Sequence, residues 1–313
     1  MKKLDLRHNE YKALLAQFTK HLTTLNYSKE TVYNAENYTK EYLVYLQEHQ
    51  LELSKVKELT TYFDYLQTRS NQKTTGALSL NSLHKHRSTL KLFYDFLHHI
   101  KSFHPVSFPL LAKPKTYPKV LDLKDVQQLF NACDDTLLGK RNKAVLALYY
   151  GLGLRKKEGV MLGVTEVDFI KEEVFIAQSK TSYQRIVPMS EHVKAILEDY
   201  VFNVREKLVP KDKSTTTLLV TELGKPLHGE TAVYILKKLL REAKIKKQAS
   251  LHTLRHSIAT HLLESGMKLE NIALFLGHRS LDSTQIYTHL TGSTVNKELS
   301  NNPIKQQKNG TAN

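Results

Sequence analysis

Four side chains in the last third of the chain are of types that could bind a phosphate and transfer protons. Arg255 lies three residues after His252, so the two share one face if this stretch is a helix. Gly277 is a typical helix-ending residue, which would place His278 just past a helix terminus, and Tyr287 follows nine residues later. A guanidinium forks onto phosphate oxygens, an imidazole transfers protons and a phenol can act as a nucleophile. Any one of these residues alone would more often be structural, whereas their combination indicates a chemical site.

That combination resembles the C-terminal signature of the tyrosine recombinases, the phage integrase family. The signature reads His-x-x-Arg, then Leu-Gly-His, then a tyrosine nine residues after that histidine. The upstream stretch 149–158, Tyr-Tyr-Gly-Leu-Gly-Leu-Arg-Lys-Lys-Glu, resembles the first box of the family. That box carries an arginine, here Arg155, and three residues later an acid, here Glu158.

The stretch 179–188 resembles the hairpin that carries the lysine of the family, here Lys180. The family usually has glycine directly after this lysine, whereas this chain has Thr181. No long insertion separates the hairpin from the histidine box, and no separate arm-binding domain precedes the first helices. The chain therefore resembles the compact, Xer-like members of the family.

The resemblance implies site-specific recombination, in which DNA is cut and rejoined by transesterification. Tyr287 would attack the scissile phosphorus and leave a 3′-phosphotyrosyl enzyme with a free 5′-hydroxyl. Arg155 and Arg255 would each bind non-bridging phosphate oxygens and stabilise the charge that grows in the transition state.

The remaining site residues would move or hold protons. By the same resemblance, Lys180 would protonate the departing 5′-oxygen, His252 would assist proton transfer at the tyrosine, and His278 would hydrogen-bond a phosphate oxygen. Glu158 would either orient the surroundings of the first arginine or serve as a structural salt-bridge partner. We expect no cofactor and no metal, because the covalent bond conserves the phosphodiester energy and the arginines supply the electrostatic stabilisation.

The charge of the chain favours a polyanionic partner. Its 313 residues carry a formal net charge of +15, with an isoelectric point near 9.5. Double-stranded DNA is the first candidate, an anionic membrane surface the second, and mere solubility the simplest alternative. The membrane alternative is weak, because the longest apolar run, 144–154, is too short to span a bilayer and no signal peptide is visible.

Cys133 is the single cysteine of the chain. It excludes an intrachain disulfide and a cysteine-based metal site, and it fits a protein of the reducing cytoplasm.

The length and the proline distribution predict two domains. Residues 1–103 read as four amphipathic helices, resembling the core-binding domain with which the family clamps one face of DNA. Half of the chain's eight prolines lie between 105 and 118, which marks 104–120 as a linker. Residues 121–294 would form the catalytic domain, and 295–313 a C-terminal segment and tail. The expected fold class is mainly α, with a helical bundle followed by a mixed α+β domain.

The second domain should hold a small antiparallel sheet. Segments 167–170, 174–177 and 185–188 read as three short strands. Helices are expected at 140–150 and 191–207, among others.

The fourth helix of the N-terminal half has a basic side. Lys85, Arg87 and Lys91 lie away from its apolar stripe and could grip phosphates, although a charged helix face is usually just solvated. His84 and His86 are read as polar or DNA-facing positions on the same helix.

Two alternatives stay open beside a recombinase. One is a type IB topoisomerase, which uses similar chemistry, and the other is a non-catalytic DNA-binding or architectural protein. Recombination needs four protomers on paired sites, so we expect a homotetramer on DNA, with a second recombinase or an accessory protein as a further partner. Val295 and Leu299 lie four residues apart and could dock on a neighbouring protomer.

Overall fold

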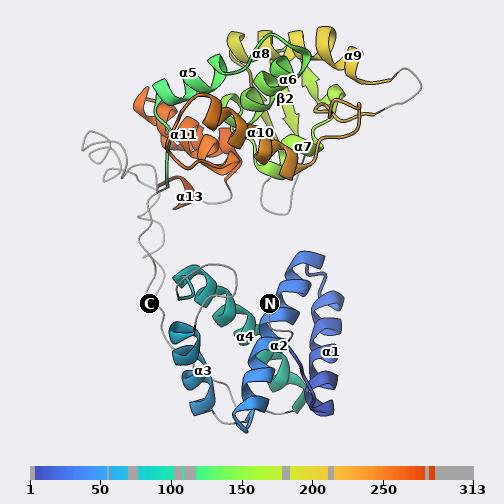
Figure 1. Cartoon of the computed structure of the whole chain (residues 1–313), viewed down its shortest axis with the longest axis vertical. Coiled ribbons are helices and arrows are strands. Elements are labelled where there is room, and N and C mark those ends of the chain that lie inside the picture. Colours follow the sequence, from blue (N-terminus) through green and yellow to red (C-terminus); the bar gives the residue numbers. More distant parts are fainter. Residues whose placement is uncertain are drawn as a thin grey trace, which may run out of the picture. The chain divides into compact units, whose positions relative to one another are not determined.

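The computed structural model describes residues 4–54, 56–69, 77–101, 108, 118–177, 184–210, 215–278 and 282–285. Contacts divide the chain into two compact units, Met1–Thr116 and Tyr117–Asn313 (Figure 1). Most of the proline-rich segment 104–120 lies outside the described residues.

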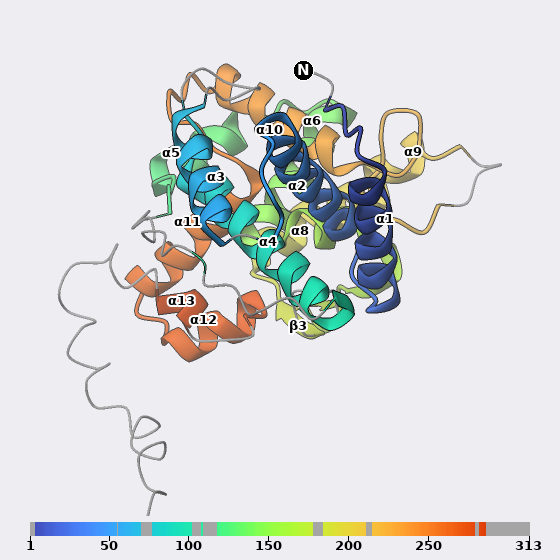
Figure 2. The same ribbon diagram turned by 90° about the horizontal axis from the view of Figure 1, so that it is seen from below.

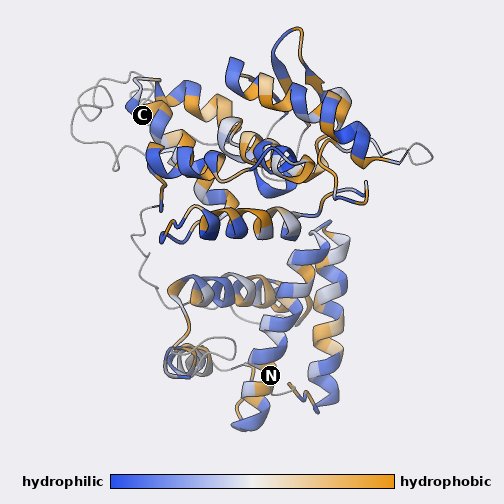
Figure 3. Cartoon of the chain, turned by 45° about the horizontal axis from the view of Figure 1, so that its top comes forward, coloured by the Kyte–Doolittle hydropathy of each residue, from blue (hydrophilic) through white to orange (hydrophobic). Residues whose placement is uncertain are grey.

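The described part of the first unit is helical. Its elements are α1 (Asn9–Thr24), α2 (Lys29–Glu48), α3 (Val56–Thr68) and α4 (Leu80–Lys101). Side-chain caps fix two of the helix starts. Ser28 accepts a hydrogen bond from the backbone N–H of Thr31, and Ser79 accepts one from the N–H of Ser82. Polar and apolar residues alternate along the ribbons as expected for amphipathic helices (Figure 3).

Aromatic side chains pack among leucines in the core of the first unit. Tyr42, Tyr62 and Phe93 are fully buried between the helices. The hydroxyls of Tyr42 and Tyr94 lie 2.7 Å apart, and Tyr94 also donates to the carbonyl of Leu53 at 3.1 Å. A buried hydroxyl without a hydrogen-bond partner would destabilise the fold. These bonds give the tyrosine hydroxyls partners, so the apolar core can contain tyrosine.

One expectation for the first unit is wrong, because His86 does not face solvent. Its side chain is buried beneath Tyr38, with a ring-centroid distance of 4.3 Å, and its Nδ1 lies 3.4 Å from the hydroxyl of Tyr62. Burial, together with the nearby Arg69, lowers the pKa of His86 to about 3. The histidine is therefore a neutral core residue and not a phosphate contact.

The second unit combines helices with a small sheet. Its elements are α5 (Leu123–Asn131), α6 (Leu137–Leu146), the π-helical turn η1 (Ala147–Gly151), α7 (Lys156–Met161), the short 3-10 turn η2 (Val164–Glu166), β1 (Val167–Asp168), β2 (Glu173–Ile176), β3 (Arg185–Pro188), α8 (Glu191–Glu198), the π-helical turn η3 (Asp199–Arg205), α9 (Glu206–Leu208), α10 (Gly229–Glu242), α11 (Leu251–Glu264), α12 (Leu269–Leu276) and α13 (Asp282–Gln285). Figure 2 shows α12 and α13 next to each other, in agreement with their contacts.

The sheet has the predicted antiparallel order β1-β2-β3. Val174 pairs with Val167 on one side and with Val187 on the other, and all three side chains point into the core. The strands are shorter than the sequence suggests, since β1 ends at Asp168. The expected fold class is confirmed: a helical unit is followed by a mixed α+β unit with a three-stranded antiparallel sheet.

The centre of the second unit is the continuous segment α6–η1, which packs against α11. The helix expected at 140–150 begins earlier, at Leu137, because Thr136 caps it, and its last turn widens into a π-helix. Tyr149 is buried there and donates its hydroxyl to the carbonyl of Lys156 at 3.1 Å. The loop that follows thereby brings the start of α7 against the start of α11, where the candidate site lies.

Candidate active site

The start of α11 holds two of the candidate residues on one side. Ser250 caps this helix by accepting a hydrogen bond from the N–H of Thr253 at 3.2 Å, which fixes the first turn. His252 and Arg255 follow three residues apart. His252 is exposed, whereas only 1% of Arg255 is accessible. The helix therefore presents one imidazole to solvent and buries the guanidinium below it.

Arg255 hydrogen-bonds the backbone of two glycine-containing turns. It donates one hydrogen bond to the carbonyl of Gly153 and one to the carbonyl of Leu276, each at 2.6 Å. Gly153 has a φ of +59°, and a Cβ added there would lie 2.8 Å from the Leu276 side chain. Glycine is thus required both for the backbone conformation and for the close approach of α12.

Arg155 directly precedes α7 on the opposite side of the same cluster. Its backbone N–H donates to Oε2 of Glu158 at 2.9 Å, and its Nη1 donates to Oε1 at 3.0 Å. The guanidinium also reaches the carbonyls of Leu276 and Gly277, both at 3.4 Å. One-fifth of the Arg155 side chain stays accessible, so a ligand can still approach it.

Glu158 is the anion around which the cations gather. Its side chain is 2% exposed and faces Arg155 at 3.0 Å, Arg185 at 3.1 Å and Arg255 at 3.9 Å. A carboxylate loses its hydration when it is buried, so it persists as an anion only with such partners. Among the described residues, three guanidiniums face this carboxylate, so positive charge is in excess around it.

His278 lies where Gly277 ends α12. Gly277 adopts the left-handed conformation, with a φ of +66°, as expected from its position after the helix. The backbone N–H of His278 then bonds the carbonyl of Ala273 at 2.9 Å. Its Nδ1 lies 2.8 Å from the hydroxyl of Thr284, a buried residue of α13. This contact fixes the ring orientation through a group that the sequence had not singled out.

The histidines of the cluster are biased toward the neutral form. Burial, followed by Arg255 and Arg155, lowers the pKa of His278 to about 3. Burial and the adjacent His252 lower the pKa of His256 to about 4, and the two rings meet edge to face at 4.4 Å. Partial burial, Arg255 and Arg155 also lower the pKa of His252. At neutral pH the site therefore offers uncharged imidazoles beside charged guanidiniums.

A titration checks this arrangement. Because its pKa is lowered to about 3, His278 should stay neutral from about pH 8 down to about pH 5, whereas an unperturbed histidine changes charge in that range. The measurement is the chemical shift of its ring Hε1 proton in the DNA-free protein, assigned with a His278→Gln variant. A midpoint near 6.5 would contradict the burial and the neighbouring charges described above.

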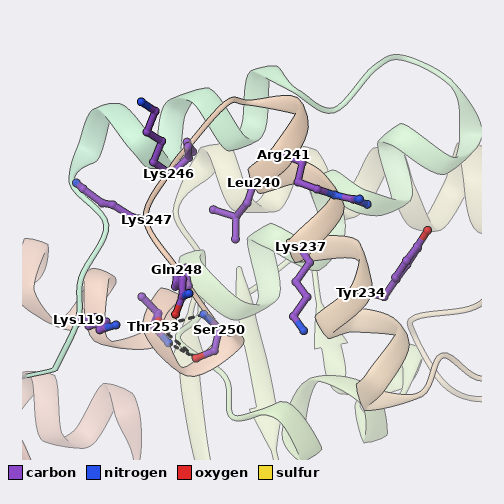
Figure 4. Close-up of a pocket in the computed structure, with 12 residues that line it drawn as sticks. Lys119, Tyr234, Lys237, Leu240, Arg241, Lys246, Lys247, Gln248, Ser250 and Thr253 are labelled. Carbon is purple, nitrogen blue, oxygen red and sulfur yellow. Dashed lines mark hydrogen bonds between the residues drawn. The ribbon is translucent and has the colours of Figure 1, made fainter. Parts of the chain in front are cut away.

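A basic groove adjoins the start of α11. It has a volume of about 910 Å³ and lies between the end of α10, the loop to Ser250 and the first turn of α11 (Figure 4). Lys237 and Arg241 of α10 and Lys246 of the following loop are among its lining residues (Figure 4). Lys247 also lines the groove but pairs with Asp122 at 2.8 Å and with Asp125. The exposed Lys237, Arg241 and Lys246 suit an extended anion bound beside the first turn of α11.

The structure brings together Arg155, Glu158, His252, Arg255 and His278 from α7, α11 and the end of α12. Lys180 and Tyr287 lie outside the described residues.

Three further residues of the cluster were missed by the sequence interpretation: Arg185, His256 and Thr284. His256 could have been found from its position four residues after His252 on one helix. Arg185 stands inside the lysine box but reads there as an ordinary strand residue. Nothing local marks Thr284.

Comparison with known proteins identifies the family. Residues 119–293 match the family model described as the phage integrase family. The tyrosine recombinase XerD of Oceanobacillus iheyensis is 34% identical over 75% of this chain and 86% of its own length. The tyrosine recombinase XerC of Natranaerobius thermophilus is 31% identical over 86% of this chain and 88% of its own.

Solved structures share the fold. The Tn1549 transposon integrase in complex with transposon right end DNA superposes with a TM-score of 0.73 at 18% identity, covering 92% of this chain and 98% of that one. XerH bound to its difH substrate in a pre-cleavage complex gives a TM-score of 0.71 at 17% identity, covering 94% and 98%. Because the family model spans more than half of the residues and close relatives span most of the length, the chain belongs to the phage integrase family, the tyrosine recombinases, and is Xer-like.

Proposed function

We propose that the chain cuts and rejoins double-stranded DNA at specific sites through a covalent 3′-phosphotyrosyl intermediate. The observation that carries the proposal is the pair Arg155 and Arg255, held against one buried carboxylate with positive charge in excess and flanked by His252 and His278. Family membership supports it, since the named relatives are tyrosine recombinases and the Tn1549 integrase and XerH structures contain DNA.

In the proposed reaction the phenol oxygen of Tyr287 forms a bond to the scissile phosphorus while the bond to the 5′-oxygen breaks. The phenolic proton leaves by way of His252, and Lys180 supplies a proton to the departing 5′-hydroxyl. Rejoining runs the same steps backward from a 5′-hydroxyl of the partner strand, so no external energy source is needed.

The two arginines act on the phosphate. Each guanidinium would bind non-bridging oxygens, and His278 would donate a hydrogen bond to one of them from Nε2 if Nδ1 accepts from Thr284. A neutral imidazole with a fixed tautomer is suited to that task. Glu158 orients the arginines through the contacts described above.

The alternatives predict different behaviour. An architectural protein would bind DNA without any covalent product, and a type IB topoisomerase would relax supercoils without joining two different duplexes. The experiment that separates a strand-cutting enzyme from an architectural protein incubates the chain with fragmented genomic DNA carrying random nicks, removes non-covalent protein with detergent and sequences the retained fragments. We expect attachment at few sites; absence of any covalent product would sink the proposal.

The basic groove should contribute to DNA affinity. Lys237→Ala/Arg241→Ala removes two exposed charges that line it, so binding should weaken and the slope of log K against log salt should become shallower by about 2. The matched control is Lys171→Ala/Lys194→Ala, which removes two lysines outside the groove and should change the slope less. Equal effects of the two double variants would leave the groove without a special role.

We also propose that residues 1–103 act as the core-binding domain. On α4, Lys85 and Lys91 are exposed and Arg87 is half-buried. Arg87 and Lys91 lie four residues apart and so on one face, whereas Lys85 points to another side. Neutralising Arg87 and Lys91 should reduce DNA affinity more than neutralising Lys85 alone. Since DNA is the substrate and the single cysteine suits a reducing compartment, we expect the protein to act in the cytoplasm.

Assembly on paired sites is part of the proposal. Strand exchange between two duplexes requires four protomers, and residues 295–313, which lie outside the described residues, are proposed to dock on a neighbouring protomer through Val295 and Leu299. Truncation after Gly292 should spare binding to a single site but impair assembly of tetramers on paired sites. Mass photometry of the DNA complexes measures this, and full-length assembly by the truncated chain would refute docking in trans.

A further inference from the structure

Arg185 lies at the junction of three site segments. It is the first residue of β3, yet its side chain leaves the sheet and is only 7% exposed. Its Nε donates to the carbonyl of Phe275 on α12 at 2.9 Å. Its two terminal nitrogens donate to the two oxygens of Glu158, at 3.4 and 3.1 Å. One guanidinium thus connects the sheet, the start of α7 and the last turn before His278.

The Arg185 side chain fits here because residue 277 is a glycine without a Cβ. A Cβ added to Gly277 would lie 2.9 Å from both Cδ and Nη1 of Arg185. The glycine therefore serves two purposes: it ends α12 in the left-handed conformation, and it lets Arg185 pass beneath the turn that carries His278.

Besides its packing contacts, Arg185 helps to neutralise the charge of Glu158. Arg185 donates to both oxygens of Glu158, as Arg155 also does, so Arg185 compensates part of the carboxylate charge that Arg155 and Arg255 face. Without Arg185, the same buried carboxylate would have to be neutralised more completely by the other two guanidiniums. Their charge would then be directed at Glu158 instead of at a bound phosphate.

We propose that Arg185 is a positioning residue, which satisfies Glu158 and anchors the end of α12 so that Arg155, Arg255 and His278 are held ready for a phosphate. It does not contact the phosphate itself. This inference rests on the proposed function, because it concerns how that site stabilises the transition state. It assigns a task to a residue outside the six candidate catalytic positions.

The first test compares Arg185→Gln with Arg205→Gln in the full chain. Arg205 is a matched control: it is also partly buried and donates to the backbone carbonyls of Thr215, Thr217 and Leu218, away from the candidate residues. Arg185→Gln should slow formation of the covalent adduct by about 10- to 100-fold, the range seen when the outer partner of a site group is lost. Its DNA dissociation constant should stay close to that of the wild-type chain, because Arg185 does not contact the phosphate. Arg205→Gln should lower the melting temperature without slowing the reaction of the folded protein.

The second test separates positioning from plain structural support. A methylphosphonate at the scissile position replaces a charged phosphate oxygen by a methyl group, so the reaction needs less positive charge. The defect of Arg185→Gln relative to wild type should shrink on this DNA, because the lost quantity is charge aimed at the phosphate. A defect of the same size on both DNAs would overturn the proposal, since it would reflect general damage to the fold.

A double-variant cycle with Glu158→Gln completes the design. If Arg185 acts by satisfying the carboxylate, Arg185→Gln should cost much less in a Glu158→Gln background than in wild type. Additive losses would overturn the proposal. Arg185→Lys should rescue poorly, because an ammonium cannot bond two carboxylate oxygens and a carbonyl in the same planar arrangement. Failure of the proposed function is distinguishable, because the wild-type chain would then form no covalent adduct on either DNA.

Discussion

Tyr287→Phe should abolish covalent attachment to DNA while leaving DNA affinity nearly unchanged. The substitution removes the hydroxyl that we propose bonds the phosphorus, and it retains the ring. The measurement is the amount of protein that stays on nicked DNA after detergent treatment, together with the dissociation constant of the non-covalent complex.

The control for this substitution is Tyr33→Phe, which removes the hydroxyl of an exposed tyrosine of α2 in the first unit. That variant should react at the wild-type rate. If Tyr287→Phe instead formed the adduct at the wild-type rate, another residue would have to be the nucleophile.

Arg255→Ala should have the second largest effect, on both the reaction and the fold. Loss of one preorganised group that stabilises the transition-state charge typically costs roughly 10²–10³-fold in rate. The same substitution removes the donor to the carbonyl of Gly153, leaves the carbonyl of Leu276 with only the longer bond from Arg155 at 3.4 Å, and removes one cation beside Glu158. Breaking a buried charge interaction in this way costs about 3–5 kcal/mol of the free energy of unfolding. Single-turnover cleavage and thermal unfolding measure the two consequences separately.

Arg141→Ala provides the matched comparison for Arg255→Ala. Arg141 is 9% exposed and donates to Asn142 at 2.9 Å on α6, so its loss should also destabilise the fold. The folded fraction of that variant should cleave normally. Arg255→Lys should keep the charge but lose the two-pronged hydrogen bonding, and should recover little of the rate. Cleavage by Arg255→Ala within about threefold of wild type would remove this residue from the proposed machinery.

Much of the fold could be predicted because its signals are local. Helix caps such as Ser28 and Asp122 directly precede apolar repeats, and Gly277 marks the end of α12 through its own conformational freedom. The sheet was predictable from three short alternating segments. Spacing on one helix also placed His252 and Arg255 on the same side before any tertiary contact was known.

The missed features depend on contacts between distant parts of the chain. Arg185 pairs with Glu158, 27 residues away, and with a carbonyl 90 residues away, and no periodic pattern encodes either contact. His86 looked like a surface histidine because its helix is polar around it, but the aromatic cluster of the first unit encloses it.

The π-helical turns were missed for a different reason. At Ala147–Gly151 and Asp199–Arg205 the helix gains a residue per turn, which shifts the face that later residues present. In η3 the shift accompanies a buried Tyr200, whose hydroxyl donates to the carbonyl of Leu218 at 3.1 Å and accepts from the N–H of Val220 at 3.1 Å. A search for the 3.6-residue period reads such segments as continuous α-helix.

No helix within the described residues is long and apolar enough to cross a bilayer. The net charge of +15 favours an anionic partner, and family membership points to DNA.

The most direct test of the central claim is to identify the residue that becomes linked to DNA. The trapped complex is digested with nuclease and trypsin, and the peptide that carries a nucleotide remnant is sequenced by mass spectrometry. Trypsin cleaves after Arg279 and Lys297, which releases residues 280–297 with Tyr287 as their single tyrosine. The account predicts the remnant on Tyr287, joined through the 3′-phosphate of the cut strand. A remnant on any other residue, or on a 5′-phosphate, would contradict it.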